Sequence, residues 1–72
     1  MRVLIVDDDR LVTSALKMIL ESDREIEVAG TGNSGKQAID LYMASKPDVL
    51  LMDIRMDEMT GIEAAKIILE KD

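Results

Sequence analysis

Acidic residues directly follow two apolar segments of the chain, and their type and position suit metal-dependent chemistry. Asp7 and Asp8 come after the apolar residues 3–6, and Asp53 comes after the apolar residues 49–52. If these segments are neighbouring parallel strands, their carboxyl ends lie at one edge of the sheet, where ligands bind in open α/β folds. The sequence therefore predicts that the three carboxylates meet in one crevice.

The composition limits which metal such a crevice would hold. Carboxylates a few ångströms apart repel one another unless a cation or a basic side chain offsets their charge. The chain has no His and no Cys, the ligands that Zn²⁺ favours, whereas oxygen ligands completed by water suit Mg²⁺. We therefore expect a hard divalent cation. The structural alternative is that Asp9 caps a helix, its neighbours complement the helix dipole and Asp53 is an ordinary loop residue.

Hydrophobic patterning predicts the elements that position these residues. Three apolar segments alternate with three amphipathic segments, as in a parallel sheet with crossover helices. Residues 3–6 and 49–52 are apolar at every position, which is typical of strands covered on both faces, whereas residues 26–28 alternate like an edge strand. The predicted strands are residues 2–6, 26–29 and 49–52, and the predicted helices are residues 11–21, 35–44 and 61–71.

Each predicted helix has an apolar face at the spacing of three and four residues that favours packing on the sheet. The face of the first helix comprises Leu11, Ala15, Met18 and Ile19, flanked by Leu16 and Leu20. The second has Ala38, Ile39, Leu41 and Tyr42, and the third has Ile62, Ala65, Ile68 and Leu69. Thr60 and Glu63 have the spacing of a capping box at the start of the third helix.

Length and charge narrow the class of protein. Seventy-two residues form at most one small domain. Because the chain has no Cys, disulfides are excluded, which fits a reducing cytoplasm. A formal net charge of -6 argues against direct binding of nucleic acid by this segment. The apolar segments are far too short for a signal sequence or a membrane span. We therefore expect a cytoplasmic domain whose partners are cations or basic groups.

Two stretches resemble a known family. VLIVDDD, followed by an amphipathic helix, and DVLLMDIRMDEMTGIEA resemble the first-strand and third-strand signatures of receiver domains of two-component response regulators. The resemblance covers the whole chain and implies a flavodoxin-like α/β fold with parallel strands in the order 2-1-3. It also implies that Asp53 is the phosphoacceptor and that Asp8 and Asp53 bind Mg²⁺ directly. Asp7 would assist, often through water, and the backbone carbonyl of Arg55 would be the remaining protein ligand.

The same resemblance implies partners and a setting. A sensor histidine kinase, or a small phosphodonor, would supply the phosphoryl group, and the domain would be an acceptor that assists its own phosphorylation rather than an enzyme. The stretch GTGNSGKQAIDL resembles bacterial regulators of the LuxR type, whose output domain binds DNA and regulates transcription. The parent protein is therefore expected to be a cytoplasmic signal-transduction protein.

The chain departs from the family pattern in two ways. Asp57 stands where the family commonly has Pro, which adds charge beside the site. A complete receiver has five strands and five helices, so residues 1–72 are expected to form only its N-terminal part, with three strand–helix pairs. The family's Ser or Thr after strand 4 and Lys after strand 5 would then be missing, and phosphoryl transfer would be impaired.

Two alternatives remain open at this stage. Residues 30–35 match the motif G-x-G-x-x-G before the second helix, and Asp53 follows at roughly the sequence distance of a ribose-binding acidic residue, which would suit a dinucleotide. The other interpretation of this segment is a tight turn capped by Ser34 and Gln37. The second alternative is a self-associating fragment, because strand 49–52 would lack the neighbour that strand 4 provides. Two copies would pair these edges antiparallel, or exchange elements by domain swapping, to form a homo-oligomer.

Overall fold

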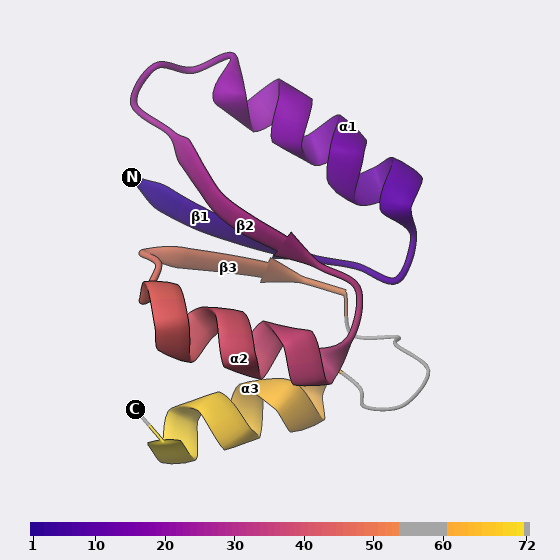
Figure 1. Cartoon of the computed structure of the whole chain (residues 1–72), viewed down its shortest axis with the longest axis vertical. Coiled ribbons are helices and arrows are strands. Elements are labelled where there is room, and N and C mark those ends of the chain that lie inside the picture. The colour runs from indigo at the N-terminus through magenta and orange to yellow at the C-terminus, as the bar shows by residue number, and fades with distance from the viewer. Residues whose placement is uncertain (54–60, 72) are drawn as a thin grey trace.

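The computed structural model describes residues 1–53 and 61–71, which form a three-stranded parallel sheet with helices on both faces. The elements are β1 (Arg2–Val6), α1 (Arg10–Glu21), β2 (Glu27–Gly32), α2 (Gly35–Ser45), β3 (Val49–Met52) and α3 (Gly61–Lys71). The strand order is β2-β1-β3, and both pairings are parallel. Figure 1 shows α1 on one side of the sheet and α2 and α3 on the other. The predicted fold class and strand order are confirmed.

The central strand β1 forms the core. Val3, Leu4, Ile5 and Val6 are each at most 2% exposed, because β2 and β3 flank the strand and helices lie on both faces. This position explains why the segment is apolar at every residue. On the face covered by α2, Val6 packs with the buried Ala38, and half-buried side chains of β3 complete the cluster.

Strand β2 extends further than predicted. Two glycines, which weaken strand propensity, lie in the part that the prediction left out. Gly30 pairs with Leu4 and Gly32 pairs with Val6, so the predicted end at residue 29 was wrong. A Cβ atom on Gly32 would lie 3.0 Å from the Leu41 side chain and 3.2 Å from Cβ of Gln37. The absence of a side chain therefore lets α2 pack closely against the strand.

Side-chain caps begin the first two helices. Asp9 is the N-cap of α1, and its side chain accepts a hydrogen bond from the Leu11 backbone N–H at 2.9 Å. Ser34 caps α2 by accepting from the Gln37 N–H at 3.1 Å, as the sequence suggested. The Gln37 side chain accepts from the Asn33 N–H at 2.8 Å, so this turn is held from both directions. The predicted cap at Thr60 lies outside the described residues.

The apolar face of α2 was predicted correctly, whereas that of α1 was not. Ala38 is buried in α2 and the other three predicted residues are half-buried. In α1, Leu11, Met18 and Ile19 are 81%, 76% and 65% exposed.

The side of α1 that is least exposed carries Thr13, Leu16 and Leu20 instead. This helix is apolar around more of its circumference than one contact with the sheet can cover. In α3, Ile68 is buried as predicted and Ala65 is half-buried, but Ile62 and Leu69 are exposed.

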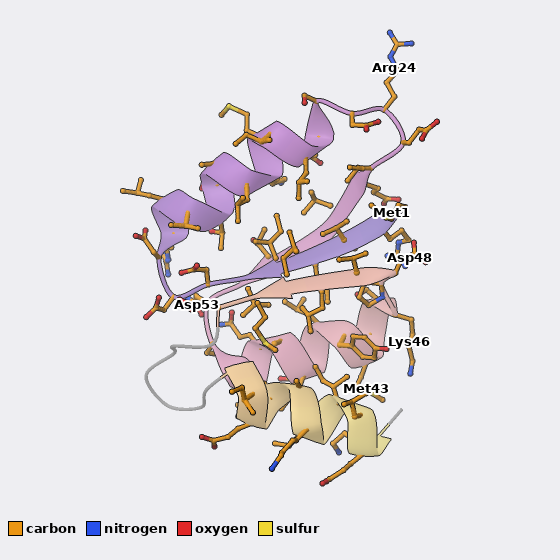
Figure 2. The ribbon with its side chains drawn as sticks, turned by 180° about the vertical axis from the view of Figure 1, so that it is seen from behind. Met1, Arg24, Met43, Lys46, Asp48 and Asp53 are labelled. Atoms are coloured by element: carbon orange, nitrogen blue, oxygen red, sulfur yellow. The ribbon has the colours of Figure 1, made fainter. Side chains whose placement is uncertain are left out.

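Hydrogen bonds close the end of the sheet opposite the acidic residues. The Glu27 N–H donates to the Met1 carbonyl at 2.8 Å, and the Asp48 N–H donates to the Arg2 carbonyl at 2.9 Å. The Arg2 N–H donates in return to the Asp48 carboxylate at 2.8 Å. Figure 2 shows Met1 and Asp48 at this end and Asp53 at the other. Within residues 1–53 and 61–71, no helix has the length and apolar character needed to cross a membrane.

Candidate metal centre

Backbone hydrogen bonds extend the strand pairing by one residue and thereby fix the acidic positions. The Asp7 N–H donates to the Gly32 carbonyl at 3.1 Å, which continues the pairing of β1 with β2. The Asp53 N–H donates to the Val6 carbonyl at 3.0 Å, which continues the pairing of β3 with β1. Both Asp residues therefore stand at defined positions on the carboxyl edge of the sheet.

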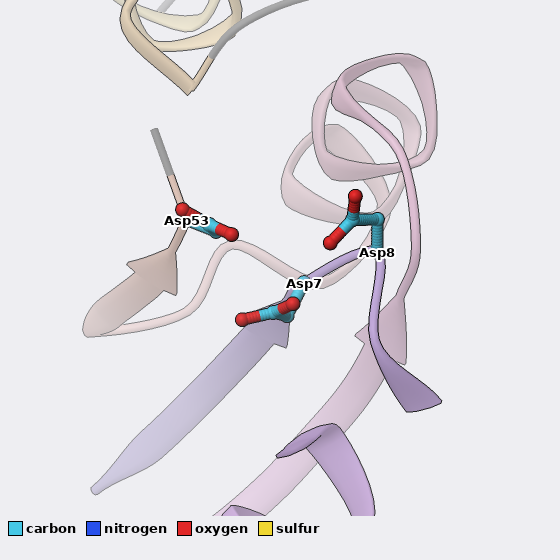
Figure 3. A group of neighbouring side chains, drawn as sticks. All are labelled: Asp7, Asp8 and Asp53. Carbon is cyan, nitrogen blue, oxygen red and sulfur yellow. The ribbon is translucent and has the colours of Figure 1, made fainter. Parts of the chain in front are cut away.

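The three predicted carboxylates converge at this edge. One carboxylate oxygen from each of Asp7, Asp8 and Asp53 lies within 4.8 Å of the other two. Asp7 and Asp53 are half-buried and Asp8 is exposed. Figure 3 shows the three side chains directed toward one another from the ends of two adjacent strands. The predicted crevice is confirmed as an arrangement of side chains.

This arrangement fits a hard divalent cation. Mg²⁺ binds oxygen at about 2.0–2.1 Å, so two oxygens on opposite sides of one ion are about 4.2 Å apart. A spread of 4.8 Å is close to that value, and small side-chain movements or bridging water would accommodate the difference. The remaining predicted ligand, the backbone carbonyl of Arg55, lies outside the described residues, so its role stays a prediction.

Asp9 is adjacent to the cluster in sequence but has a different role. Its side chain is used in capping α1, as the structural alternative proposed for this residue. Its backbone N–H donates a 2.9 Å hydrogen bond to Oδ1 of Asp7, which fixes one oxygen of that carboxylate. Sequence reasoning did not predict this contact, although an Asp two residues before a helix cap favours such a turn.

Two of the carboxylates line an apolar cavity, and a second, polar cavity lies beside α1. A cavity of about 350 Å³ is lined by Ile5, Val6, Asp7, Leu16, Leu51, Met52 and Asp53. A smaller cavity of about 210 Å³, between α1 and the start of α2, is lined by Arg10, Thr13, Ser14, Thr31, Gly32, Asn33 and Gln37. Because Asp7 and Asp53 both line the apolar cavity, a group bound between them would contact apolar walls as well as carboxylates.

The structure gives the glycine-rich segment a packing role that argues against the dinucleotide hypothesis. Gly30 and Gly32 lie within β2, whereas the dinucleotide motif needs its first glycine in a turn after a strand. Among the described residues, no glycine has a positive φ angle. The close approach of Leu41 and Gln37 accounts for Gly32 without a bound phosphate.

Comparison with known proteins identifies the family. The model of the response regulator receiver domain matches residues 3–72. The transcriptional regulatory protein YdfI of Bacillus subtilis is 43% identical over 70 residues, which are 97% of this chain and 33% of that protein. A protein-glutamate methylesterase/protein-glutamine glutaminase of Pyrococcus abyssi is 40% identical over 70 residues, which are 97% of this chain and 19% of that protein.

A solved structure agrees with both sequence matches. The crystal structure of the response regulator domain of Thermotoga maritima CheB has a TM-score of 0.95 and 41% sequence identity to this chain. The match covers 99% of this chain and 53% of that one. The chain thus spans about half of a solved receiver domain, and a third or less of the curated relatives named above. Those two relatives differ in output, so the LuxR-type output stays a prediction. By its sequence, strand order and acidic edge, the chain belongs to the response regulator receiver domain family.

Proposed function

We propose that this chain is the phosphoacceptor part of a two-component response regulator and that Asp53 accepts the phosphoryl group in a Mg²⁺-dependent reaction. The observation that carries the proposal is the convergence of Asp53 with Asp7 and Asp8 at the carboxyl edge of a receiver-family sheet. Receiver domains generally bind Mg²⁺ through such acidic residues. The other carboxylates on this edge would serve to hold the cation beside the acceptor.

In the proposed reaction, a carboxylate oxygen of Asp53 attacks the phosphorus atom of a phosphohistidine. The new O–P bond forms as the N–P bond breaks, and the nitrogen keeps the bonding electrons and takes up a proton. The hydrogen bond from the Asp53 N–H to the Val6 carbonyl holds the backbone of the acceptor during this step. Bound Mg²⁺ would supply positive charge next to the phosphoryl oxygens.

Each acidic residue has a distinct place in this scheme. Asp8 and Asp53 would bind the cation directly, and Asp7 would assist, in part through water. The Arg55 carbonyl would complete the protein ligands. Asp7 is suited to a supporting role because the Asp9 N–H donates to its Oδ1 atom and holds the carboxylate in place. Only Asp53 becomes covalently modified, so the domain accepts one phosphoryl group rather than turning over a substrate.

The proposed donor is a sensor histidine kinase, since receiver domains interact with histidine kinases. A cytoplasmic location and a DNA-binding output of the LuxR type belong to the same proposal and rest on the resemblance of the sequence. The formal net charge of -6 weighs against nucleic-acid binding by this segment itself.

A second candidate function, self-association, is favoured by the exposed edge of the sheet. Strand β3 lies at the edge of the sheet among the described strands, and its Leu51 is 39% exposed. An apolar edge strand is a template for pairing with another chain. When these 72 residues are produced alone, two copies would pair their β3 edges or exchange elements by domain swapping.

Intact-mass spectrometry after incubation with acetyl phosphate tests the phosphoacceptor proposal. We expect a partial phosphoryl adduct in the wild-type chain when Mg²⁺ is present, in keeping with the impaired transfer expected from the sequence, and a much smaller one when EDTA removes the cation. Asp53→Asn should abolish the adduct, because an amide is not the nucleophile that the reaction requires. Absence of an adduct in the wild type, with Mg²⁺ and donor in excess, would contradict phosphoryl transfer by this chain.

A further inference from the structure

We infer that Asp9 is a positioning residue for the proposed Mg²⁺ site, because it joins the cap of α1 to the orientation of the Asp7 carboxylate. The inference rests on the proposed function and adds to it a residue outside the metal cluster. Three parts of Asp9 make hydrogen bonds in this turn. Its N–H donates to Oδ1 of Asp7, its side chain accepts from the Leu11 N–H, and its carbonyl accepts from Val12 and Thr13.

The cap and the carboxylate are coupled through one backbone conformation. Asp9 has φ −95° and ψ 111°, the extended geometry that an N-cap residue requires before a helix begins. In this conformation the Asp9 N–H lies 2.9 Å from Oδ1 of Asp7 and donates a hydrogen bond to it. Loss of the side-chain cap would loosen this backbone, and the Asp9 N–H would then hold the Asp7 carboxylate less firmly.

Fixing Asp7 in this way would favour metal binding. The Gly32 carbonyl holds the backbone of Asp7 at 3.1 Å, whereas the Asp9 N–H contacts the Asp7 side chain itself and restrains it. A carboxylate that is already oriented loses less conformational freedom when a cation binds. A hydrogen bond to an ionised carboxylate is also stronger than one between neutral groups.

Asp9 acts here as a cap and not as a fourth ligand. Among the described residues, the carboxylate oxygens that lie within 4.8 Å of one another belong to Asp7, Asp8 and Asp53. Oδ1 of Asp9 instead accepts from Leu11 at 2.9 Å. Its effect on the metal site should therefore depend on capping ability more than on its charge.

Three variants separate capping, charge and general stability. Asp9→Ala removes both the cap and the charge, whereas Asp9→Asn removes the charge and keeps a side chain that caps equally well. Ser34→Ala removes the cap of α2, which is formed by the same kind of contact in a segment that contributes no carboxylate to the cluster. Far-UV circular dichroism at the titration temperature checks that each of the three variants is folded.

Isothermal titration calorimetry with MgCl₂, using the whole 72-residue chain, gives the decisive comparison. We expect Asp9→Ala to bind Mg²⁺ about fivefold more weakly than Asp9→Asn, the factor that corresponds to one ordinary hydrogen bond. The dissociation constant of Ser34→Ala for Mg²⁺ should stay within about twofold of the wild-type value, because this change lies outside the site. Equal affinities of the two Asp9 variants would overturn the inference, and so would an equal loss in Ser34→Ala.

A second measurement tests the coupling without metal. In nuclear magnetic resonance spectra of the cation-free chain, Asp7→Ala should expose the Asp9 amide and speed its hydrogen exchange. Unchanged exchange would overturn the positioning role. Failure of the wild type to bind Mg²⁺ would overturn both the proposed function and this inference. Normal wild-type binding with equal Asp9 variants would overturn the inference alone.

Discussion

The close packing of α2 on β2 predicts a specific and sizeable effect of adding one methyl group at Gly32. A Cβ atom there would lie 3.0 Å from Cδ1 of Leu41 and 3.2 Å from Cβ of Gln37, whereas ordinary contacts are 3.4–4 Å. The Leu41 methyl can rotate, but Cβ of Gln37 is attached to the helix backbone. The Gly32→Ala variant would therefore force α2 outward by a few tenths of an ångström.

The expected cost combines two opposing effects. Overpacking of this kind costs about 1–3 kcal/mol, and the lower backbone entropy of Ala in the unfolded chain returns about 0.4–1 kcal/mol. The net loss in the free energy of unfolding should be about 1–2 kcal/mol. Gly30→Ala is the matched control, because its Cβ would meet only two leucine methyl groups, at 3.3 and 3.5 Å. Since neither glycine has a positive φ angle, the backbone itself accepts Ala at both positions.

Urea denaturation followed by far-UV circular dichroism measures this difference. With a denaturant dependence of about 1 kcal/mol per molar for a chain of this size, the midpoint of Gly32→Ala should fall by about 1–2 M. Gly30→Ala should stay within about 0.5 M of the wild type, since its overpacking and entropy effects nearly cancel. A Gly32→Ala midpoint equal to that of Gly30→Ala would refute the packing explanation and reopen the phosphate-binding interpretation of the glycine segment.

Two further predictions concern the end of α2 and the edge of the sheet. Lys46→Gly should raise the free energy of unfolding by up to about 1 kcal/mol in thermal melts. The reason is that Lys46 has a left-handed φ of 46°, which glycine adopts without strain. A lower melting temperature would mean that the contact of the Lys46 ammonium group with the Tyr42 ring, at 5.6 Å, outweighs that strain. Light scattering of the 72-residue chain at micromolar concentration should give a mass above that of the monomer, and a monomeric mass with a cooperative melt would rule out association through β3.

The sequence identified the strands that carry the site because their pattern is local. Continuous apolar segments that end in Asp predicted both β1 and β3 with their observed bounds, and the central place of β1 explains its uniform burial. The end of β2 could not be predicted in this way, because Gly30 and Gly32 disfavour strands until α2 packs on them. Where local propensity was weak, tertiary packing therefore determined where the strand ends.

The orientation of α1 shows a second limit of sequence patterns. The helix carries apolar residues on more than one side, and its contact with the sheet selects the side that contains Thr13. Thr13 is buried although it is polar, because its hydroxyl donates to the Arg10 carbonyl at 3.0 Å within the helix. A pattern that counts only apolar residues assigns this position to solvent and therefore selects the wrong side.

The site itself was predictable as a set of residues but not as a set of contacts. Parallel strands bring their carboxyl ends together, so the meeting of Asp7, Asp8 and Asp53 followed from topology. The hydrogen bond from the Asp9 N–H to Asp7 depends on dihedral angles that sequence does not specify. The part played by Arg55 depends on residues outside the described ranges.

The central claim is that Asp53 carries the phosphoryl group, and site mapping tests it most directly. After reaction with acetyl phosphate and Mg²⁺, borohydride reduction converts an aspartyl phosphate to homoserine, which tandem mass spectrometry of peptides can locate. We predict homoserine at residue 53 and unmodified Asp at positions 7, 8 and 9. Homoserine at any of those three positions in place of residue 53 would contradict the assignment of Asp53 as the acceptor.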